Sequence, residues 1–368
     1  MDVTRPRPPA DPDFVQLLTE DGQSRPHPDY PLTLSERDYR DLYTDLVMVR
    51  RIDTEATALQ RQGELGLWVP CLGQEAAQVG SGRALRPGDH AFPSYREHGV
   101  AWCRGVDPLA LLGMWRGVTN GGWDPRATNF HLYTIVIGSQ VLHATGYAMG
   151  VARDGADDAV IAYFGDGASS QGDVSEAFTY ASVFDAPVVF FCQNNQWAIS
   201  APVSRQSRSP LYHRALGFGF PGVRVDGNDV LACLAVTRHA LDHARAGNGP
   251  FLIEAYTYRM GAHTTSDDPT RYRSPDEVAH WRARDPISRV EALLRRTGAA
   301  DEEFFASVAA RADALAARLR AGCLAMPEPD PLTMFDHVYT EPHGPVAAQR
   351  DAHTRYLNSF ADTDADHH

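Results

Sequence analysis

Two apolar segments joined by a helical one constrain the fold of this chain more than any other feature. Residues 159–164 read AVIAYF and residues 187–194 read PVVFFCQN, so each is a nearly continuous apolar run. Such runs are typical of strands in a parallel sheet that helices cover on both faces. The stretch between them, at 175–184, has the pattern of a helix. This order predicts a right-handed crossover between two neighbouring parallel strands.

The same alternation extends along most of the chain. A helix is expected from Thr33 to about Gly63, because Glu36 completes a capping box with Thr33 and apolar residues then recur at helical spacing. Further strands are expected at 222–225 and 251–258, and further helices at 229–246, 276–284 and 301–322. The alternation predicts an α/β fold with a doubly wound, mostly parallel sheet.

Composition predicts three parts. Residues 1–32 are rich in proline and acidic residues, which predicts an extended, poorly ordered N-terminal arm. Residues 33–343 are expected to form one α/β domain that includes the C-terminal helices. Residues 344–368 predict a loose polar tail.

Charge and hydropathy argue against several classes of protein. The formal net charge of -13 argues against a nucleic-acid partner, since there is no excess of basic residues to neutralise phosphates. The apolar runs are too short to cross a membrane. The five cysteines are widely spaced and form no CxxC pair, so neither a zinc site nor a disulfide framework is expected. We expect a soluble, cytoplasmic protein.

Polar residues follow the two apolar strands where each strand ends. Gly165, Asp166 and Gly167 follow the first, and Asn194 and Asn195 end the second. Because the carboxyl ends of parallel strands meet at one edge of a sheet, Asp166 and Asn195 should face the same small volume. A carboxylate, an amide oxygen and a backbone carbonyl could hold Mg²⁺, with phosphate oxygens and water completing its shell. The alternative, a simple tight turn, usually joins two hairpin strands, whereas here the continuation is helical.

At these motifs the chain resembles a known family. The GDG…NN pair matches the thiamine-diphosphate motif, and YFGDGASSQGD and FFCQNNQWAIS are similar to the α subunits of 2-oxo acid dehydrogenases, of the branched-chain type in particular. The resemblance covers roughly residues 33–340. It continues through GQEAAQVG (73–80), SYREHGV (94–100), IGSQ (137–140), VRVDGNDV (223–230) and YRMGAHTTSDDPTRYRS (258–274).

The resemblance implies a thiamine-diphosphate-binding fold and a set of site residues. Asp166, Asn195 and the backbone oxygen of Trp197 should hold Mg²⁺. The residues expected to contact the cofactor are Tyr95, Arg96, Ile135, Ile137, Gly165, Asp166, Gly167, Ala168, Asn195 and His263. The Ile137 side chain should hold the cofactor bent, so that a thiamine diphosphate ylid forms, attacks the 2-oxo acid and promotes its decarboxylation.

Two histidines match family histidines near the cofactor. The resemblance implies a catalytic role for His263, beside which Arg259 and the run TSDDPTRYR also match. His131 is a second catalytic candidate, although a structural histidine is about as common at such a position. The loop after His263 should be ordered by a charged frame of Arg259, Asp268, Tyr272 and Arg273.

The chain departs from the animal branched-chain enzymes at two positions. Gln193 stands where they have an arginine that contacts the diphosphate. Thr264 stands where they have a regulatory serine, so control by a dedicated kinase is not expected. Ser139 and Gln140 match a segment that binds a monovalent cation in some relatives.

The family relation implies partners. The glutamate that starts cofactor activation comes from a β subunit in two-chain enzymes, so two α and two β chains are expected to form a heterotetramer. The acyl group would pass to lipoyl-lysine on an acyltransferase core. Alone, this chain should bind cofactor poorly and not turn over.

Three alternative functions make different demands on the sequence. A pyruvate or acetoin dehydrogenase α subunit would keep the chemistry and change the substrate. A nucleotide-binding regulatory protein would require the motif GxGxxG after the first strand, and the GDGASS at 165–170 does not match it. A transketolase-like enzyme would need a second cofactor domain in the same chain, and none is found.

Overall fold

The computed structural model describes residues 14–364, which divide into two compact units. The first extends to Leu324 and the second begins at Ala325. The sequence had suggested a later division, after residue 343. Among residues 14–364 no helix is both long and apolar enough to span a membrane.

The first unit is built on a six-stranded parallel sheet with the order β1-β7-β8-β4-β3-β2. Its strands are β1 (Phe14–Val15), β2 (His90–Phe92), β3 (Val160–Gly165), β4 (Val188–Asn194), β7 (Gly222–Asp226) and β8 (Phe251–Tyr256). A short antiparallel pair, β5 (Trp197–Ala198) and β6 (Ala201–Pro202), lies in the connection that follows β4. The expected α/β class and the four expected strands are confirmed, with strand ends that differ from the expected ones by one or two residues.

Two helical layers cover the sheet and explain why its strands are apolar throughout. Ile161 and Tyr163 of β3 belong to one core, with residues of α1 (Glu36–Arg61), α2 (Glu75–Ala84) and α9 (Val230–Arg245). Val160, Ala162 and Phe164 belong to a second core, with residues of α6 (Ser139–Asp154) and α7 (Gly172–Val183). Successive side chains of a strand point to opposite faces, so both faces must be apolar.

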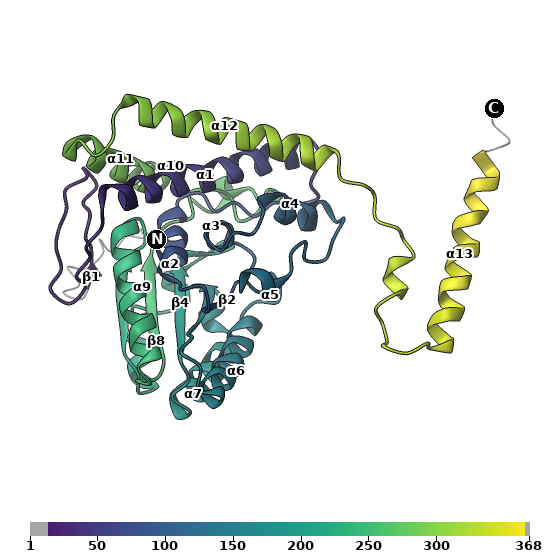
Figure 1. Cartoon of the computed structure of the whole chain (residues 1–368), viewed down its shortest axis with the longest axis horizontal. Coiled ribbons are helices and arrows are strands. Elements are labelled where there is room, and N and C mark those ends of the chain that lie inside the picture. The colour runs from purple at the N-terminus through teal and green to yellow at the C-terminus, as the bar shows by residue number, and fades with distance from the viewer. Residues whose placement is uncertain (1–13, 365–368) are drawn as a thin grey trace. The chain divides into compact units, whose positions relative to one another are not determined.

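Eight further helices belong to the described part of the chain. They are α3 (His98–Cys103), α4 (Pro108–Arg116), α5 (Pro125–Thr128), α8 (His213–Gly217), α10 (Pro275–Arg282), α11 (Pro286–Thr297), α12 (Glu302–Leu324) and α13 (Gly344–Asp364). Helix α12 runs alongside α1 (Figure 1). Helix α13 occupies most of the segment for which a loose tail was expected, and residues 365–368 lie outside the described part.

Helix α1 begins later than its expected start at Thr33. Ser35 is the N-cap, and its hydroxyl accepts the backbone N–H of Asp38 at 3.3 Å. The Asp38 carboxylate in turn accepts the backbone N–H of Ser35 at 2.8 Å. This reciprocal pair satisfies two N–H groups at the start of the helix that have no acceptor within the helix itself.

The N-terminal arm was predicted incorrectly for its second half. Phe14 and Val15 form β1, which pairs with β7, and Leu17 and Leu18 are buried. The backbone N–H groups of both leucines donate to Asp229 Oδ2, each at 2.6 Å. The arm is therefore part of the fold from residue 14 on, while residues 1–13 lie outside the described part.

Asp229 generates a stability prediction, because its buried carboxylate also caps α9 by accepting the N–H groups of Leu231 and Ala232. Replacement by alanine leaves up to four N–H groups without an acceptor. We expect Asp229→Ala to lower the free energy of unfolding by about 3 kcal/mol, as measured by urea denaturation.

Asp124→Ala is the matched control, since this N-cap of the exposed helix α5 accepts the N–H of Arg126 alone from the backbone. It should cost about 1 kcal/mol or less. Equal losses for the two variants would contradict the role given to Asp229.

Candidate active site

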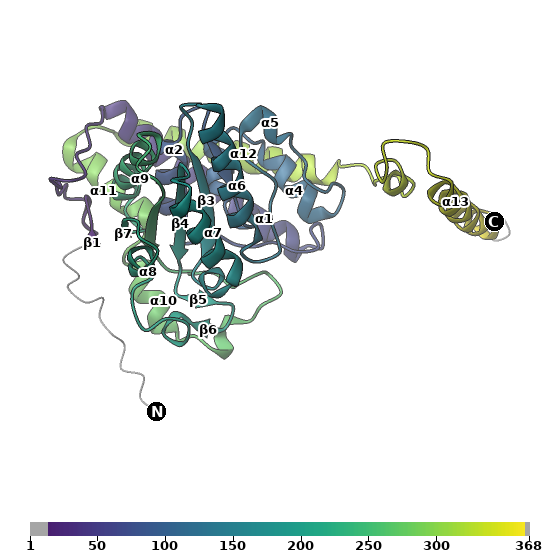
Figure 2. The same ribbon diagram turned by 90° about the horizontal axis from the view of Figure 1, so that it is seen from below.

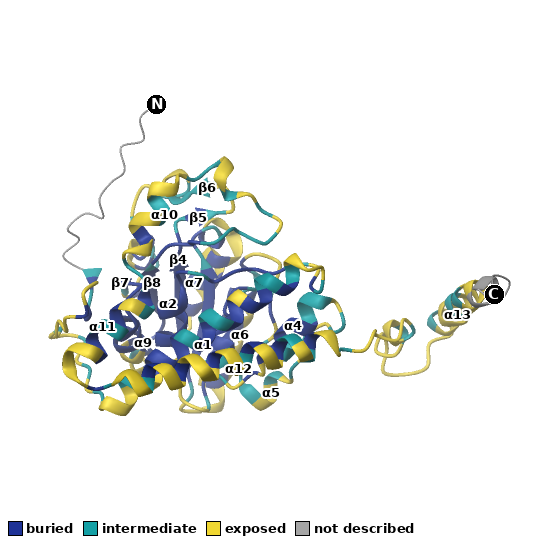
Figure 3. Cartoon of the chain, turned by 90° about the horizontal axis from the view of Figure 1, so that it is seen from above, coloured by how far each residue is buried: buried dark blue, intermediate teal, exposed yellow. Residues whose placement is uncertain are grey.

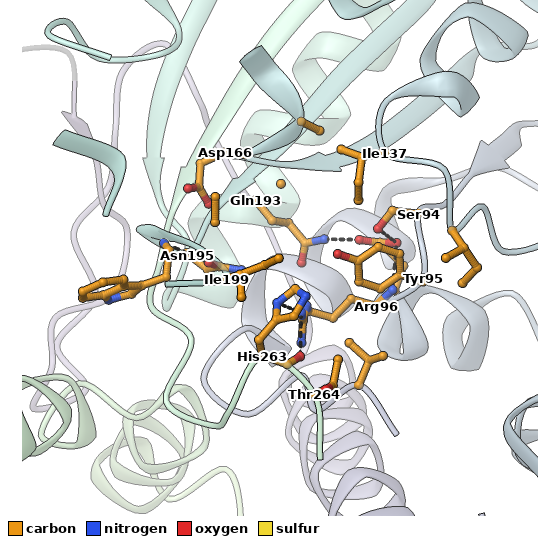
Figure 4. A pocket seen from close by; sticks show the side chains of 18 of the residues that line it. Ser94, Tyr95, Arg96, Ile137, Asp166, Gln193, Asn195, Ile199, His263 and Thr264 are labelled. Carbon is orange, nitrogen blue, oxygen red and sulfur yellow. Dashed lines mark hydrogen bonds between the residues drawn. The ribbon is translucent and has the colours of Figure 1, made fainter. Parts of the chain in front are cut away.

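A cavity of about 470 Å³ lies at the carboxyl ends of β3 and β4. Figure 4 shows side chains from several separate segments pointing into it. The lining residues come from the segments 94–97, 135–140, 165–168, 193–199 and 263–264, together with Leu67, Val69, Gln74, Trp115 and Gln171. Parallel strands bring their functional loops to this edge, as the sequence predicted.

Asp166 and Asn195 lie in this one cavity (Figure 4). Asp166 is 2 % exposed and forms no ion pair within residues 14–364. Burial raises the pKa of its carboxyl group to about 6, although Arg259 and a long hydrogen bond from Gln206, at 3.3 Å, act against the shift. A buried carboxylate without an ion pair suits a cation.

The two other oxygens expected to bind metal are oriented by neighbours. The Asn195 amide group donates to Gln74 Oε1 at 3.0 Å. Its oxygen accepts the backbone N–H of Trp197 at 3.2 Å and keeps a second lone pair for a cation. The backbone oxygen of Trp197 accepts from Arg259 at 3.0 Å and keeps a second lone pair. Among the described residues no three His, Cys, Asp or Glu side chains gather as a metal site. A cation here would therefore depend on amide and carbonyl oxygens and on the bound ligand.

Two buried guanidinium groups face one imidazole beside these oxygens. Arg96 donates to His263 Nδ1 at 3.2 Å, and Arg259 approaches the same nitrogen at 3.4 Å. Neither arginine forms an ion pair with a carboxylate in residues 14–364, and Arg259 is 0 % exposed. Burial, with Arg96 nearby, lowers the pKa of Arg259 to about 10. Such unpaired positive charge suits an anionic ligand such as a diphosphate.

His263 is neutral in this setting. Burial first, and then the charges of Arg96 and Arg259, lower the pKa of its imidazole to about 3. Because guanidinium groups can only donate, Nδ1 must be the acceptor, and the single ring proton is on Nε2. His263 is thus held as a neutral hydrogen-bond donor.

The loop after His263 is held by three of the four residues expected to frame it. Arg259 donates to the Tyr272 hydroxyl at 3.0 Å, and Tyr272 hydrogen-bonds Asp267. Arg273 donates to the backbone oxygens of Gly261 and Met260, at 3.0 and 2.9 Å. Asp268 instead caps a short turn by accepting the N–H of Thr270.

His131 does not line the cavity. Its ring stacks on Phe92 with centroids 3.7 Å apart, and its Nε2 lies 3.3 Å from His90 Nδ1. Burial first, and then His90, lower its pKa to about 4. His90 also contacts the Tyr147 hydroxyl at 3.0 Å. These contacts favour the structural alternative for His131 over the catalytic one.

The remaining expected cofactor contacts, Tyr95, Ile135, Ile137, Gly165, Gly167 and Ala168, all line the cavity. Gly165 opens on free space, since an added Cβ would meet no atom within 4 Å. An added Cβ on Gly167 would lie 2.8 Å from the Cβ of Ala198. Ile135 is 53 % exposed and, with Val136, forms part of an apolar rim.

Sequence reasoning assigned no role to two buried polar side chains of the cavity, Gln74 and Glu97. Glu97 accepts a hydrogen bond from Gln193, and Gln74 Nε2 has no hydrogen-bond partner among the described residues. The side-chain oxygens of Gln140 and Gln193, two residues that the sequence analysis did name, also have no partner there. Gln74 and Glu97 do lie within segments of family resemblance, but nothing in the sequence says that their side chains turn inward.

The model of the dehydrogenase E1 component family matches residues 43–317. The chain belongs to this family. Membership implies that this E1 component depends on thiamine diphosphate and takes part in the oxidative decarboxylation of a 2-oxo acid.

Two similar relatives are the 3-methyl-2-oxobutanoate dehydrogenase subunit alpha of Mycobacterium tuberculosis and the pyruvate dehydrogenase E1 component subunit alpha of Staphylococcus aureus. The first is 48 % identical over 338 residues, which are 92 % of each chain. The second is 38 % identical over 304 residues, which are 82 % of each chain.

The electrostatics of His263 can be tested directly. We expect its imidazole to remain neutral with Nε2 protonated from pH 5 to 9, because burial disfavours the charged form and protonation would place a third positive charge against two buried guanidinium groups. Nitrogen-15 NMR of histidine-labelled protein measures this, and the signal lost in His263→Asn identifies the residue. A midpoint near 6.5 for that signal would contradict the assignment.

Proposed function

We propose that this chain is the α subunit of the decarboxylating component of a branched-chain 2-oxo acid dehydrogenase. The observation that carries the proposal is the meeting of a buried carboxylate, Asp166, and a buried arginine, Arg96, in one cavity, with a second buried arginine, Arg259, behind its lining residues Trp197 and His263. Such a site suits a ligand that combines a metal ion with a diphosphate. The relative named for 3-methyl-2-oxobutanoate is also more similar than the one named for pyruvate, at 48 % against 38 % identity.

The chain's own residues suit Mg²⁺ and thiamine diphosphate. Asp166, Asn195 and the Trp197 carbonyl would hold Mg²⁺, and Arg96 and His263 would bind diphosphate oxygens. The aminopyrimidine would lie against the Ile135–Ile137 segment, with Tyr95 beside it. Bound thiamine diphosphate supplies the electron sink for decarboxylation.

In the reaction the protein's own residues position the ligands and stabilise charge. Asp166 offsets the cation, while Arg96 and Arg259 offset anionic oxygen. The Nε2–H of His263 can donate to the phosphate, to the 2-oxo acid or to a lipoyl group that enters the cavity, without adding a charge of its own.

The proposed partner is a β subunit, in a heterotetramer of two α and two β chains. Glu97 and Asp166 are the two carboxylates that line the cavity in the described part of the chain. Glu97 is hydrogen-bonded to Gln193 and Ser94, and Asp166 is assigned to the cation. Another carboxylate would therefore have to start cofactor activation. The exposed apolar rim of Ile135, Val136 and Ile199 suits the surface of a second chain that would supply it. The acyl group would then pass to lipoyl-lysine on an acyltransferase core.

A monovalent cation site at Ser139 and Gln140 is also proposed. The Gln140 amide group donates to the backbone oxygen of Tyr163 at 2.8 Å, which leaves its buried Oε1 without a partner. A carbonyl-type oxygen of this kind is a suitable ligand for a hard cation.

The substrate is tested on the complex reconstituted from this chain and its β subunit. We expect a higher kcat/KM for 3-methyl-2-oxobutanoate than for pyruvate, because the cavity wall includes the apolar side chains Leu67, Val69 and Ile199. Neither substrate should turn over with the α chain alone. Equal or better use of pyruvate favours the pyruvate dehydrogenase alternative, and turnover by the α chain alone would overturn the need for a partner.

The metal site is tested by Asp166→Asn, which keeps the shape and removes the charge. We expect Mg²⁺-dependent binding of thiamine diphosphate, followed by quenching of tryptophan fluorescence, to weaken more than about 100-fold. In the unaltered protein the affinity should fall below pH 6, because a proton then competes with the metal for the carboxylate. Asp154→Asn, on the exposed end of α6, is the control and should bind normally.

A further inference from the structure

Glu97 brings a second buried carboxylate into the cavity, and no cation pairs with it in residues 14–364. Its side chain is 1 % exposed. Its Oε2 accepts from the Ser94 hydroxyl at 2.9 Å and lies 3.4 Å from the backbone N–H of Arg96. The Arg96 guanidinium group turns the other way, to the backbone oxygens of Pro70 and His263 and to His263 Nδ1. Burial raises the pKa of Glu97 against these hydrogen bonds and the Arg96 charge.

The amide of Gln193 is oriented by that carboxylate. Gln193 Nε2 donates to Glu97 Oε1 at 2.6 Å, and Gln193 Oε1 is buried without a partner. If Glu97 is ionised, only the amide NH₂ can face it, because two acceptors at this distance would repel each other. Figure 4 shows the Gln193 side chain extending into the middle of the pocket. The atom that it leaves free in the cavity is an acceptor.

An acceptor at this place opposes the expected ligand. Gln193 is the β-sheet partner of Gly165, which opens on the cavity, and it shares that cavity with Arg96 and His263. A diphosphate carries only acceptor oxygens and would meet both an amide oxygen and, behind it, an ionised Glu97. Both contacts are unfavourable, and one proton can remove both.

We propose that Glu97 and Gln193 form a proton-coupled positioning pair, in which diphosphate binding makes Glu97 take up one proton from solvent. This inference rests on the proposed function. The new O–H of Glu97 donates to Gln193 Oε1, the amide turns over, and its NH₂ donates to a diphosphate oxygen. Glu97 thus acts through Gln193 and does not touch the cofactor.

The charged and titratable groups around Glu97 do not make the uptake of this proton unnecessary. Arg96 lies on the same segment and is directed to His263. His98, next in the chain, contacts the Tyr133 hydroxyl and the Val69 carbonyl, and burial lowers its pKa to about 3, so it stays neutral. Burial raises the pKa values of Tyr133 and of Tyr163 on β3. Both phenols are therefore neutral as well.

The test is calorimetric titration of the α/β complex with Mg²⁺ and either inorganic pyrophosphate or thiamine diphosphate. Titration in two buffers of different ionisation enthalpy counts the protons exchanged on binding. Glu97→Gln is the central variant, because its amide can donate to Gln193 without any proton. The unaltered complex should take up close to one proton more than the variant, and protons exchanged elsewhere cancel in the comparison.

Affinity supplies a second readout. With rising pH the unaltered complex should lose affinity for pyrophosphate relative to Glu97→Gln, by up to about tenfold per pH unit. The variant should therefore bind more tightly at pH 8.5. Thiamine, which lacks the diphosphate, should show no difference. A purely structural role of Glu97 would instead weaken binding and leave the proton count unchanged.

Gln193→Met keeps the inference testable if Glu97→Gln does not fold. Without the amide donor Glu97 is more readily protonated before binding, so fewer protons should be taken up than in the unaltered complex. Equal proton counts in all complexes overturn the inference and leave the proposed function intact. Failure of the unaltered complex to bind thiamine diphosphate overturns both.

Discussion

The parallel pairing of β3 with β4 is the constraint on which the site depends. The two strands pair from Val160 with Val188 to Gly165 with Gln193, so they end side by side. Asp166 and Asn195 follow directly and enter one cavity. The pairing is held by apolar side chains on both faces, packed under α1, α2 and α9 on one side and α6 and α7 on the other. The chemistry at the tips thus depends on hydrophobic burial behind them.

Buried charged groups that do not neutralise one another gather in the cavity and directly behind its lining. Asp166, Glu97, Arg96 and Arg259 are all buried, and no ion pairs join them in the described residues. Each such group costs free energy in the protein alone, and a ligand with a cation and an anion offsets that cost when it binds. Burial, together with the two guanidinium groups that approach its Nδ1, keeps the His263 imidazole neutral.

Local sequence patterns predicted the elements and the strand ends well, because these depend on neighbours in the chain. The apolar runs, the crossover helix and the GDG and NN tips follow from periodicity and from turn chemistry. The predicted start of helix α1 was wrong because the sequence offers two capping boxes there, and the helix uses Ser35–Asp38. The N-terminal arm was misjudged because its acceptor, Asp229, is more than 200 residues away in the chain.

The sequence by itself determined the fold class, the family and the identity of the metal-binding candidates at the strand tips. Only the tertiary structure decided which side chains turn into the cavity. It placed His131 against Phe92 and away from the lining, and it joined Glu97 to Gln193 across 96 positions of the chain. The reason is physical: residue spacing sets the period of a helix or strand, but the direction and charge of a buried side chain depend on partners brought together by packing.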